Sequence, residues 1–148
     1  FSDPYFLKEA EPAILEQLRS PERQTRMQNS RAAAGYKIAL EVAMTNVRAL
    51  NDGGVRIAMG TDTGPPARFQ GYFEHMEMQM MVDAGMSPIE AIRASTGVAA
   101  DCIGMGDIGT LEPGKWADLL VLDANPAEDI ANSKTIASVW IAGNRVPD

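Results

Sequence analysis

The chain of 148 residues has few of the side chains that most often build metal and redox sites, because it holds one histidine, His75, and one cysteine, Cys102. A metal site built mainly from imidazoles needs several histidines, so this chain cannot assemble one from its own residues. A single cysteine excludes an intramolecular disulfide. With no histidine beside it in the sequence, we expect Cys102 to be a small buried apolar residue and not a nucleophile.

Positive charge and long apolar runs are also scarce. The chain carries 13 basic and 20 acidic side chains, which gives a formal net charge of −7 at pH 7. This acidic balance argues against nucleic acid or an anionic membrane as the main partner. No apolar run is long enough to span a bilayer, and the first nine residues show no signal-peptide pattern. The length and the hydrophobic content of 45% suit one domain with a real core.

Helical patterns fill most of the first two thirds of the chain. A short helix is predicted over 13–18, and Ser20-Pro21 is typical of a helix start. An amphipathic helix then follows until Gly53-Gly54, with one of these glycines expected in a left-handed conformation. Further helices are predicted over 71–84, after the capping sequence Ser87-Pro88-Ile89-Glu90, and over 96–103.

Strand patterns occupy two other parts of the chain. The segment 55–60 is short and apolar and directly follows a helix, which favours a strand buried on both faces. Near the C-terminus, 117–122 and 136–141 are predicted strands, and Gly143-Asn144 is typical of a turn after which 145–146 pairs back.

The predicted strand at 55–60 ends in Thr61-Asp62-Thr63-Gly64, within the stretch GVRIAMGTDTGPP. An acid at this place has two interpretations. Asp62 either caps the following turn through its own side chain or forms part of an active site. The residues of this stretch alone leave both interpretations open.

Four stretches in this order resemble the C-terminal part of the amidohydrolase superfamily: GVRIAMGTDTG, HMEMQMMVDAGMSPIEAIRASTGVAA, IGTLEPGKWADLLVLDANP and VWIAGNRV. The resemblance covers roughly 43–146 and is greatest to imidazolonepropionase-like and Xaa-Pro dipeptidase-like metal hydrolases. It implies an α/β fold, namely the last strand and flanking helices of a (β/α)₈ TIM-type barrel plus part of a small β-sandwich. Residues 1–109 would belong to the barrel and 110–148 would supply C-terminal strands of the sandwich.

The resemblance also implies a chemistry. The parent enzyme would hydrolyse a C–N bond of a small molecule, which is an amide, a cyclic amide or a dipeptide-like compound. The attacking water would be activated by one or two divalent metal ions, and zinc is the expected metal. Asp62 would be a metal ligand and the general acid and base. His75 is expected either to contact substrate or to be a hydrogen-bonded structural residue. Arg68 and Tyr72 would line the substrate pocket, although solvated loop positions explain them equally well.

The family pattern further includes a His-x-His pair, a mid-barrel lysine or glutamate and two more histidines. Those histidines are missing from this sequence and would lie upstream of Phe1, so we expect a fragment that is inactive and holds no metal by itself. No nucleic acid or membrane partner is expected, and a homo-oligomer is compatible with the sequence. The compartment stays open, with the cytoplasm slightly favoured. The alternatives are a standalone, non-catalytic interaction domain and an enzyme assembled from two chains.

Overall fold

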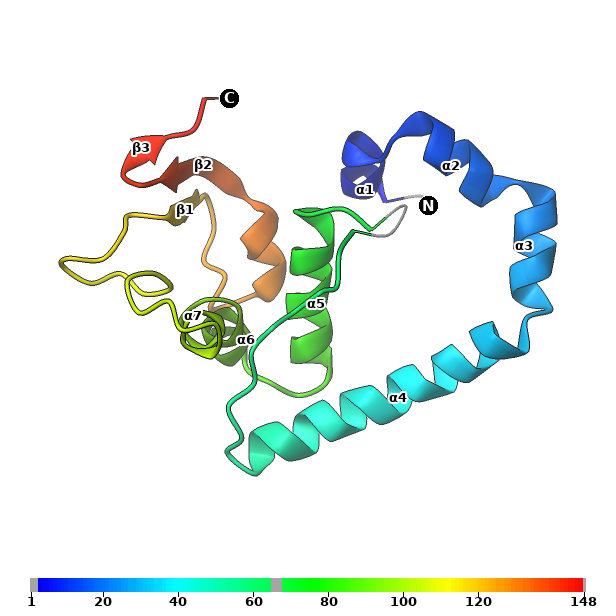
Figure 1. Cartoon of the computed structure of the whole chain (residues 1–148), viewed down its shortest axis with the longest axis horizontal. Helices are drawn as coiled ribbons and strands as arrows, with labels where there is room; N and C mark the ends of the chain where they lie inside the picture. The colour runs from blue at the N-terminus through cyan, green and yellow to red at the C-terminus, as the bar shows by residue number, and fades with distance from the viewer. Residues whose placement is uncertain (1–2, 65–67, 148) are drawn as a thin grey trace.

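The computed structural model of the chain describes residues 3–64 and 68–147. In this part of the chain an α/β fold with one small sheet is observed, as the sequence predicts. The N-terminal third is helical and forms an arc on one side of the molecule, opposite the C-terminal part (Figure 1). Its helices are α1 (Pro4–Glu9), α2 (Pro12–Arg19), α3 (Pro21–Gln28) and the long α4 (Arg31–Asp52).

The C-terminal part is a helical layer followed by a three-stranded antiparallel sheet in the order β1-β2-β3. In β1 and β2, Leu119 lies opposite Trp140, and Leu122 lies opposite Ile136 after an irregularity in register. The strand predictions for this part are thereby confirmed. Its elements are α5 (Tyr72–Asp83), α6 (Pro88–Ser95), α7 (Gly97–Cys102), β1 (Leu119–Leu122), the 3₁₀ helix η1 (Ile130–Lys134), β2 (Ile136–Ile141) and β3 (Asn144–Arg145).

Local capping explains where several of these helices begin. At α6 the Ser87 hydroxyl accepts a hydrogen bond from the Glu90 N–H, and the Glu90 carboxylate accepts one from the Ser87 N–H at 2.7 Å. Each group satisfies a donor that the first turn of a helix leaves without a partner. At α3 the Ser20 hydroxyl accepts from the Arg23 N–H before Pro21, without a reciprocal acid, so both predicted helix starts are confirmed.

The hydrophobic core lies between α5, α6 and η1. Its buried members are Met81, Met86, Ala91, Ala94 and Ile130. The long helix α4 contributes only the partly buried Val47 to the edge of this cluster and has no buried residue of its own. Among the helices that the structure describes, none is long and apolar enough to cross a membrane.

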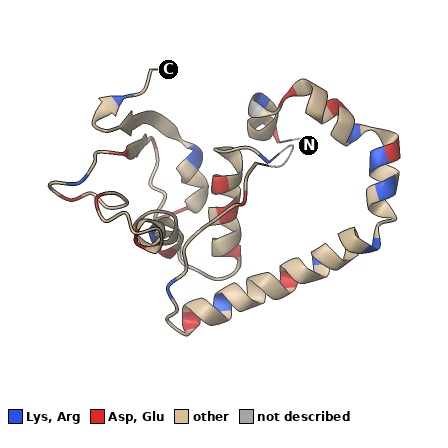
Figure 2. Cartoon of the chain, in the orientation of Figure 1, with Lys and Arg blue, Asp and Glu red and all other residues tan. Residues whose placement is uncertain are grey.

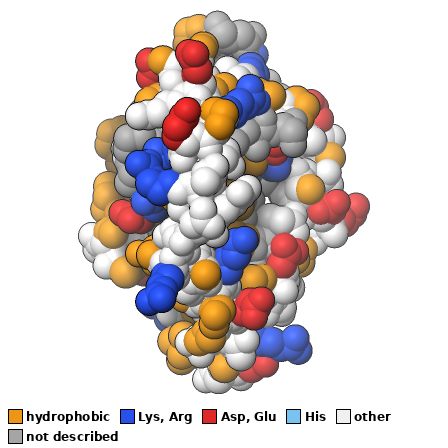
Figure 3. Space-filling view, turned by 90° about the vertical axis from the view of Figure 1, so that its right-hand side faces the viewer, with side chains coloured by type: hydrophobic (Ala, Val, Ile, Leu, Met, Phe, Trp, Pro, Cys, Tyr) orange, Lys and Arg blue, Asp and Glu red, His pale blue; other side chains and the backbone are white. Residues whose placement is uncertain are grey.

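The helices of the arc leave large apolar side chains exposed. On α4, Tyr36 is 76% and Ile38 65% exposed. Acidic and basic residues are interspersed along the same helices (Figure 2). On the outer face of the arc, apolar side chains lie between charged ones without separating into a region of one sign (Figure 3).

The prediction of a strand at 55–60 is wrong, because these residues form no strand in the described structure. A strand requires a neighbouring strand to complete its hydrogen bonds, and no described segment pairs with this one. The segment is instead attached to α6 by a hydrogen bond from the Met59 N–H to the Ala94 carbonyl at 3.0 Å. Ile57 and Met59 pack against the core, so the apolar pattern reflects burial without sheet pairing.

Candidate functional site

Asp62 lies in the loop between the 55–60 segment and α5. Its backbone has φ of +50°, a left-handed conformation that is uncommon for a residue other than glycine. The side chain is 93% exposed, and its Oδ2 lies 3.9 Å from the Arg68 Nη1. An ion pair this exposed contributes little to stability. The structure therefore presents the Asp62 carboxylate to solvent with one cationic neighbour, Arg68.

The Asp62 loop is attached to the beginning of α5 through Glu74. The Glu74 carboxylate accepts hydrogen bonds from the hydroxyls of Thr61 at 3.0 Å and Thr63 at 3.5 Å, the residues on either side of Asp62. It also accepts one from the Gly71 N–H at 2.6 Å, which caps the helix. Both sides of the loop are thus fixed to one side chain.

Tyr72, the first residue of α5, belongs to an aromatic cluster made of Tyr5, Phe6, Phe69, Tyr72 and Phe73. Its hydroxyl donates a hydrogen bond to the Asp3 carboxylate at 2.9 Å. The Lys134 ammonium lies 5.8 Å from the centre of its ring. Burial, followed by the hydrogen bond to Asp3, raises the pKa of Tyr72. These contacts hold α1 against α5, while a substrate contact by Tyr72 stays a prediction.

His75 lies one turn into α5 and is buried. Its Nδ1 is 2.9 Å from the Ser133 hydroxyl of η1, and the edge of its ring packs against Tyr5. Burial lowers the pKa of His75, and the nearby Lys134 lowers it further. A neutral imidazole hydrogen-bonded across two elements matches the structural interpretation. Substrate contact by His75 or by Arg68 stays a prediction.

A metal ion requires several ligands around one point. The described residues contain no group of three or more His, Cys, Asp or Glu side chains that could hold one. Asp62 has a cation beside it, and His75 already bonds to Ser133. These residues do not fit a complete metal site. The role of Asp62 as one metal ligand stays a prediction that needs further ligands from outside this set.

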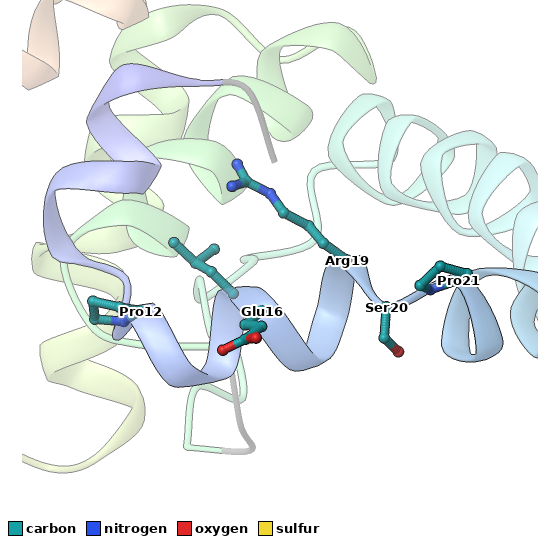
Figure 4. A pocket seen from close by; sticks show the side chains of 6 residues that line it. Pro12, Glu16, Arg19, Ser20 and Pro21 are labelled. Carbon is teal, nitrogen blue, oxygen red and sulfur yellow. The ribbon is translucent and has the colours of Figure 1, made fainter.

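Two hollows in the structure lie elsewhere. The larger, of ≈ 570 Å³, lies at the bend between α2 and α3, with Pro12 and Pro21 at its two ends (Figure 4). The smaller, of ≈ 190 Å³, is an apolar groove between α4 and α5. Neither is lined by Asp62, Arg68, Tyr72 or His75, so neither is the site that the sequence predicts.

Two residues of the site region were missed by the sequence interpretation, and one expectation is wrong. Glu74 stands at the third position of a helix that begins after Gly71, so a helix cap could have been predicted for it, but its bonds to the threonines could not. Ser133 carries no sequence signal for its bond to His75, 58 residues away. Cys102, the last residue of α7, is exposed and not buried.

The chain belongs to the amidohydrolase family, whose model matches residues 18–146. It is 32% identical over 115 residues to an imidazolonepropionase of Streptomyces avermitilis, a match that covers 76% of this chain and 28% of that protein. It is 40% identical over 96 residues to an ochratoxinase of Aspergillus niger, covering 61% of this chain and 19% of the other.

Among solved structures, a Xaa-Pro dipeptidase with bound methionine in its active site superposes with a TM-score of 0.64 at 32% identity. That match covers 71% of this chain and 25% of the dipeptidase. The chain therefore spans less than a third of the length of each of these relatives.

Proposed function

We propose that this chain is the C-terminal portion of an enzyme that hydrolyses a C–N bond of a small molecule, an amide, cyclic amide or dipeptide-like compound. The observation that carries the proposal is the exposed carboxylate of Asp62, held in a left-handed loop of a chain that belongs to the amidohydrolase family. A carboxylate placed beside the scissile bond takes a proton from the attacking water and returns it to the leaving nitrogen.

The proposal is limited to the reaction class. The three relatives carry names that refer to different substrates: imidazolonepropionase, ochratoxinase and Xaa-Pro dipeptidase. Substrate choice then belongs to loops near Asp62, where Arg68 and Tyr72 would contribute, and to residues beyond this chain. In the proposed parent, residues 1–109 complete a (β/α)₈ barrel and 110–148 a small β-sandwich. The superposition on the dipeptidase supports a shared fold over 71% of this chain, while the two ranges rest on the resemblance of the sequence.

The proposal includes a divalent metal, zinc by expectation, held mainly by ligands outside the described residues. We therefore expect the 148-residue chain alone to retain no stoichiometric divalent metal after dialysis, because its described residues offer no three-ligand group. Elemental analysis measures this directly. One tightly bound ion per chain would contradict the division of ligands between this chain and the rest of the enzyme.

The catalytic role of Asp62 is tested in the chain joined to, or co-expressed with, the N-terminal portion that the proposal requires. Amine release from a panel of amides, cyclic amides and dipeptides is the assay. Asp62→Asn keeps the shape of the side chain and removes its basicity, so kcat is expected to fall about 10²–10⁴-fold. The matched control is Asp83→Asn at the exposed end of α5, which should leave kcat unchanged. Full activity of Asp62→Asn would exclude the role.

A second candidate function is a non-catalytic interaction domain derived from the same fold. The exposed apolar side chains of α4, such as Tyr36 and Ile38, are the observation that favours it. Under this alternative, the chain is a stable folded species by itself, and no complement makes it a hydrolase. Analytical ultracentrifugation together with the amide panel separates the two candidates.

A further inference from the structure

Glu74 joins two features that are distant in the sequence, the beginning of α5 and the loop that carries Asp62. One carboxylate oxygen, Oε2, accepts from the Gly71 N–H at 2.6 Å. The other, Oε1, accepts from the Thr61 hydroxyl at 3.0 Å and from the Thr63 hydroxyl at 3.5 Å. The two oxygens of one side chain therefore serve two different elements.

On the basis of the proposed function, we propose that Glu74 is a positioning residue that fixes the orientation of the Asp62 carboxylate relative to α5. The threonines on both sides of Asp62 donate to the same Glu74 oxygen, while the Asp62 side chain faces solvent. The backbone of Asp62 is left-handed, a conformation that is less favourable than the right-handed one even though aspartate adopts it more readily than most residues. The bonds to Glu74 stabilise that conformation.

Helix capping alone does not account for this arrangement. Glu90 holds the same third position in α6 and caps it through the Ser87 N–H at 2.7 Å. The other oxygen of Glu90 accepts from Asn51 near the end of α4 and contacts no loop that carries a candidate catalytic residue. Capping thus requires one carboxylate oxygen. The second oxygen of Glu74 is what connects the helix to the Asp62 loop.

The threonine hydroxyls allow the connection to be removed without touching the cap. Changing Thr61 and Thr63 together to valine keeps the branched shape and deletes both donors, while Glu74 still accepts from Gly71. Changing both to serine keeps the donors and is the conservative rescue. Glu74→Gln removes the carboxylate itself, and Glu90→Gln is its matched control at a helix cap away from the loop.

The first readout is amide hydrogen exchange in the 148-residue chain, expressed as protection relative to the same sequence unfolded, together with the scalar coupling between the amide and α protons of Asp62, which reports its φ. The Gly64 N–H, which donates to the Arg68 carbonyl at 2.8 Å, reports on the loop, and the Gly71 N–H reports on the cap. The double valine variant is expected to lower the protection of Gly64 about tenfold and to change the Asp62 coupling, with the protection of Gly71 unchanged. The double serine variant should keep the protection and the coupling of the parent. Unchanged Gly64 protection and Asp62 coupling in the valine variant would overturn the positioning role.

The second readout is kinetics in the complemented enzyme. Because small misplacements of a catalytic group are costly, the double valine variant is expected to lower kcat about tenfold with KM unchanged. The serine variant should restore kcat, and Glu90→Gln should leave it unaltered. Altered exchange with normal kcat would overturn the role of Glu74 and leave the proposed function standing. A parent without hydrolase activity would remove the proposed function, while exchange would still decide whether Glu74 holds the loop.

Discussion

Gly109 gives the most quantitative test of the packing around α6 and α7. Its backbone has φ of +83°, and a Cβ placed on it would lie 2.7 Å from the Ala100 Cβ and 2.9 Å from the Thr96 carbonyl oxygen. These atoms belong to α7 and to the junction that precedes it. They cannot rotate away as the end of a flexible side chain can. Gly109→Ala must therefore displace either its own loop or the backbone of α7 and the junction before it.

The magnitude has two parts. Forcing an alanine into the left-handed region costs about 1–2 kcal/mol, and overpacking against fixed neighbours costs about 1–3 kcal/mol more. Gly114 supplies the control, because its φ is +89° and no heavy atom lies within 4 Å of a Cβ placed there. Gly114→Ala therefore carries only the first part. Both variants restrict the unfolded chain equally, so the difference between them isolates the steric clash.

We expect Gly109→Ala to be less stable than Gly114→Ala by about 1–3 kcal/mol, which corresponds to a Tm lower by about 2–12 °C for a chain of this size. Urea unfolding followed by far-ultraviolet circular dichroism measures the free energy of unfolding of both variants. Equal stabilities of the two alanine variants would refute the reasoning.

The remaining predictions concern His75 and the core. The folded-state pKa of His75 is lowered from 6.5 by burial and then by Lys134, so the unfolded chain takes up the proton first and stability falls as pH drops below about 6.5. Burial raises the pKa of Glu77, so this residue lowers stability as pH rises above 4.5. Plots of the free energy of unfolding against pH for His75→Asn should therefore lose only the part of the slope near pH 6.5 that His75 contributes. An unchanged slope in this variant would contradict the assignment to His75. Ile130 is 2% exposed, so Ile130→Ala should cost about 2–5 kcal/mol in urea unfolding, against less than about 1 kcal/mol for Ile103→Ala at 67% exposure. Similar losses in the two variants would place the core elsewhere.

Local sequence determined where most elements begin and end. Ser87, Pro88 and Glu90 lie within four residues and satisfy the first turn of α6 among themselves, so the helix start is encoded without reference to the rest of the fold. At α3 the start is also local, because Pro21 follows Ser20, whose hydroxyl accepts from the Arg23 N–H. The ordered stretches from 54 to 146 also indicated the family, and the match of its model over 18–146 confirms it. The same resemblance, and not the residues around it, identified Asp62 as the candidate acid.

Tertiary structure decided the rest, because the deciding partners are far away in the sequence. The 55–60 segment has the composition of a strand, but strand pairing depends on a neighbour that its own residues do not specify. The bond between His75 and Ser133 spans 58 residues, and only the packing of α5 on η1 brings them together. The attachment of the Asp62 loop to Glu74 depends on where the loop and the helix meet. A carboxylate in a sequence identifies a candidate acid, whereas its orientation is set by contacts that exist only in the folded chain.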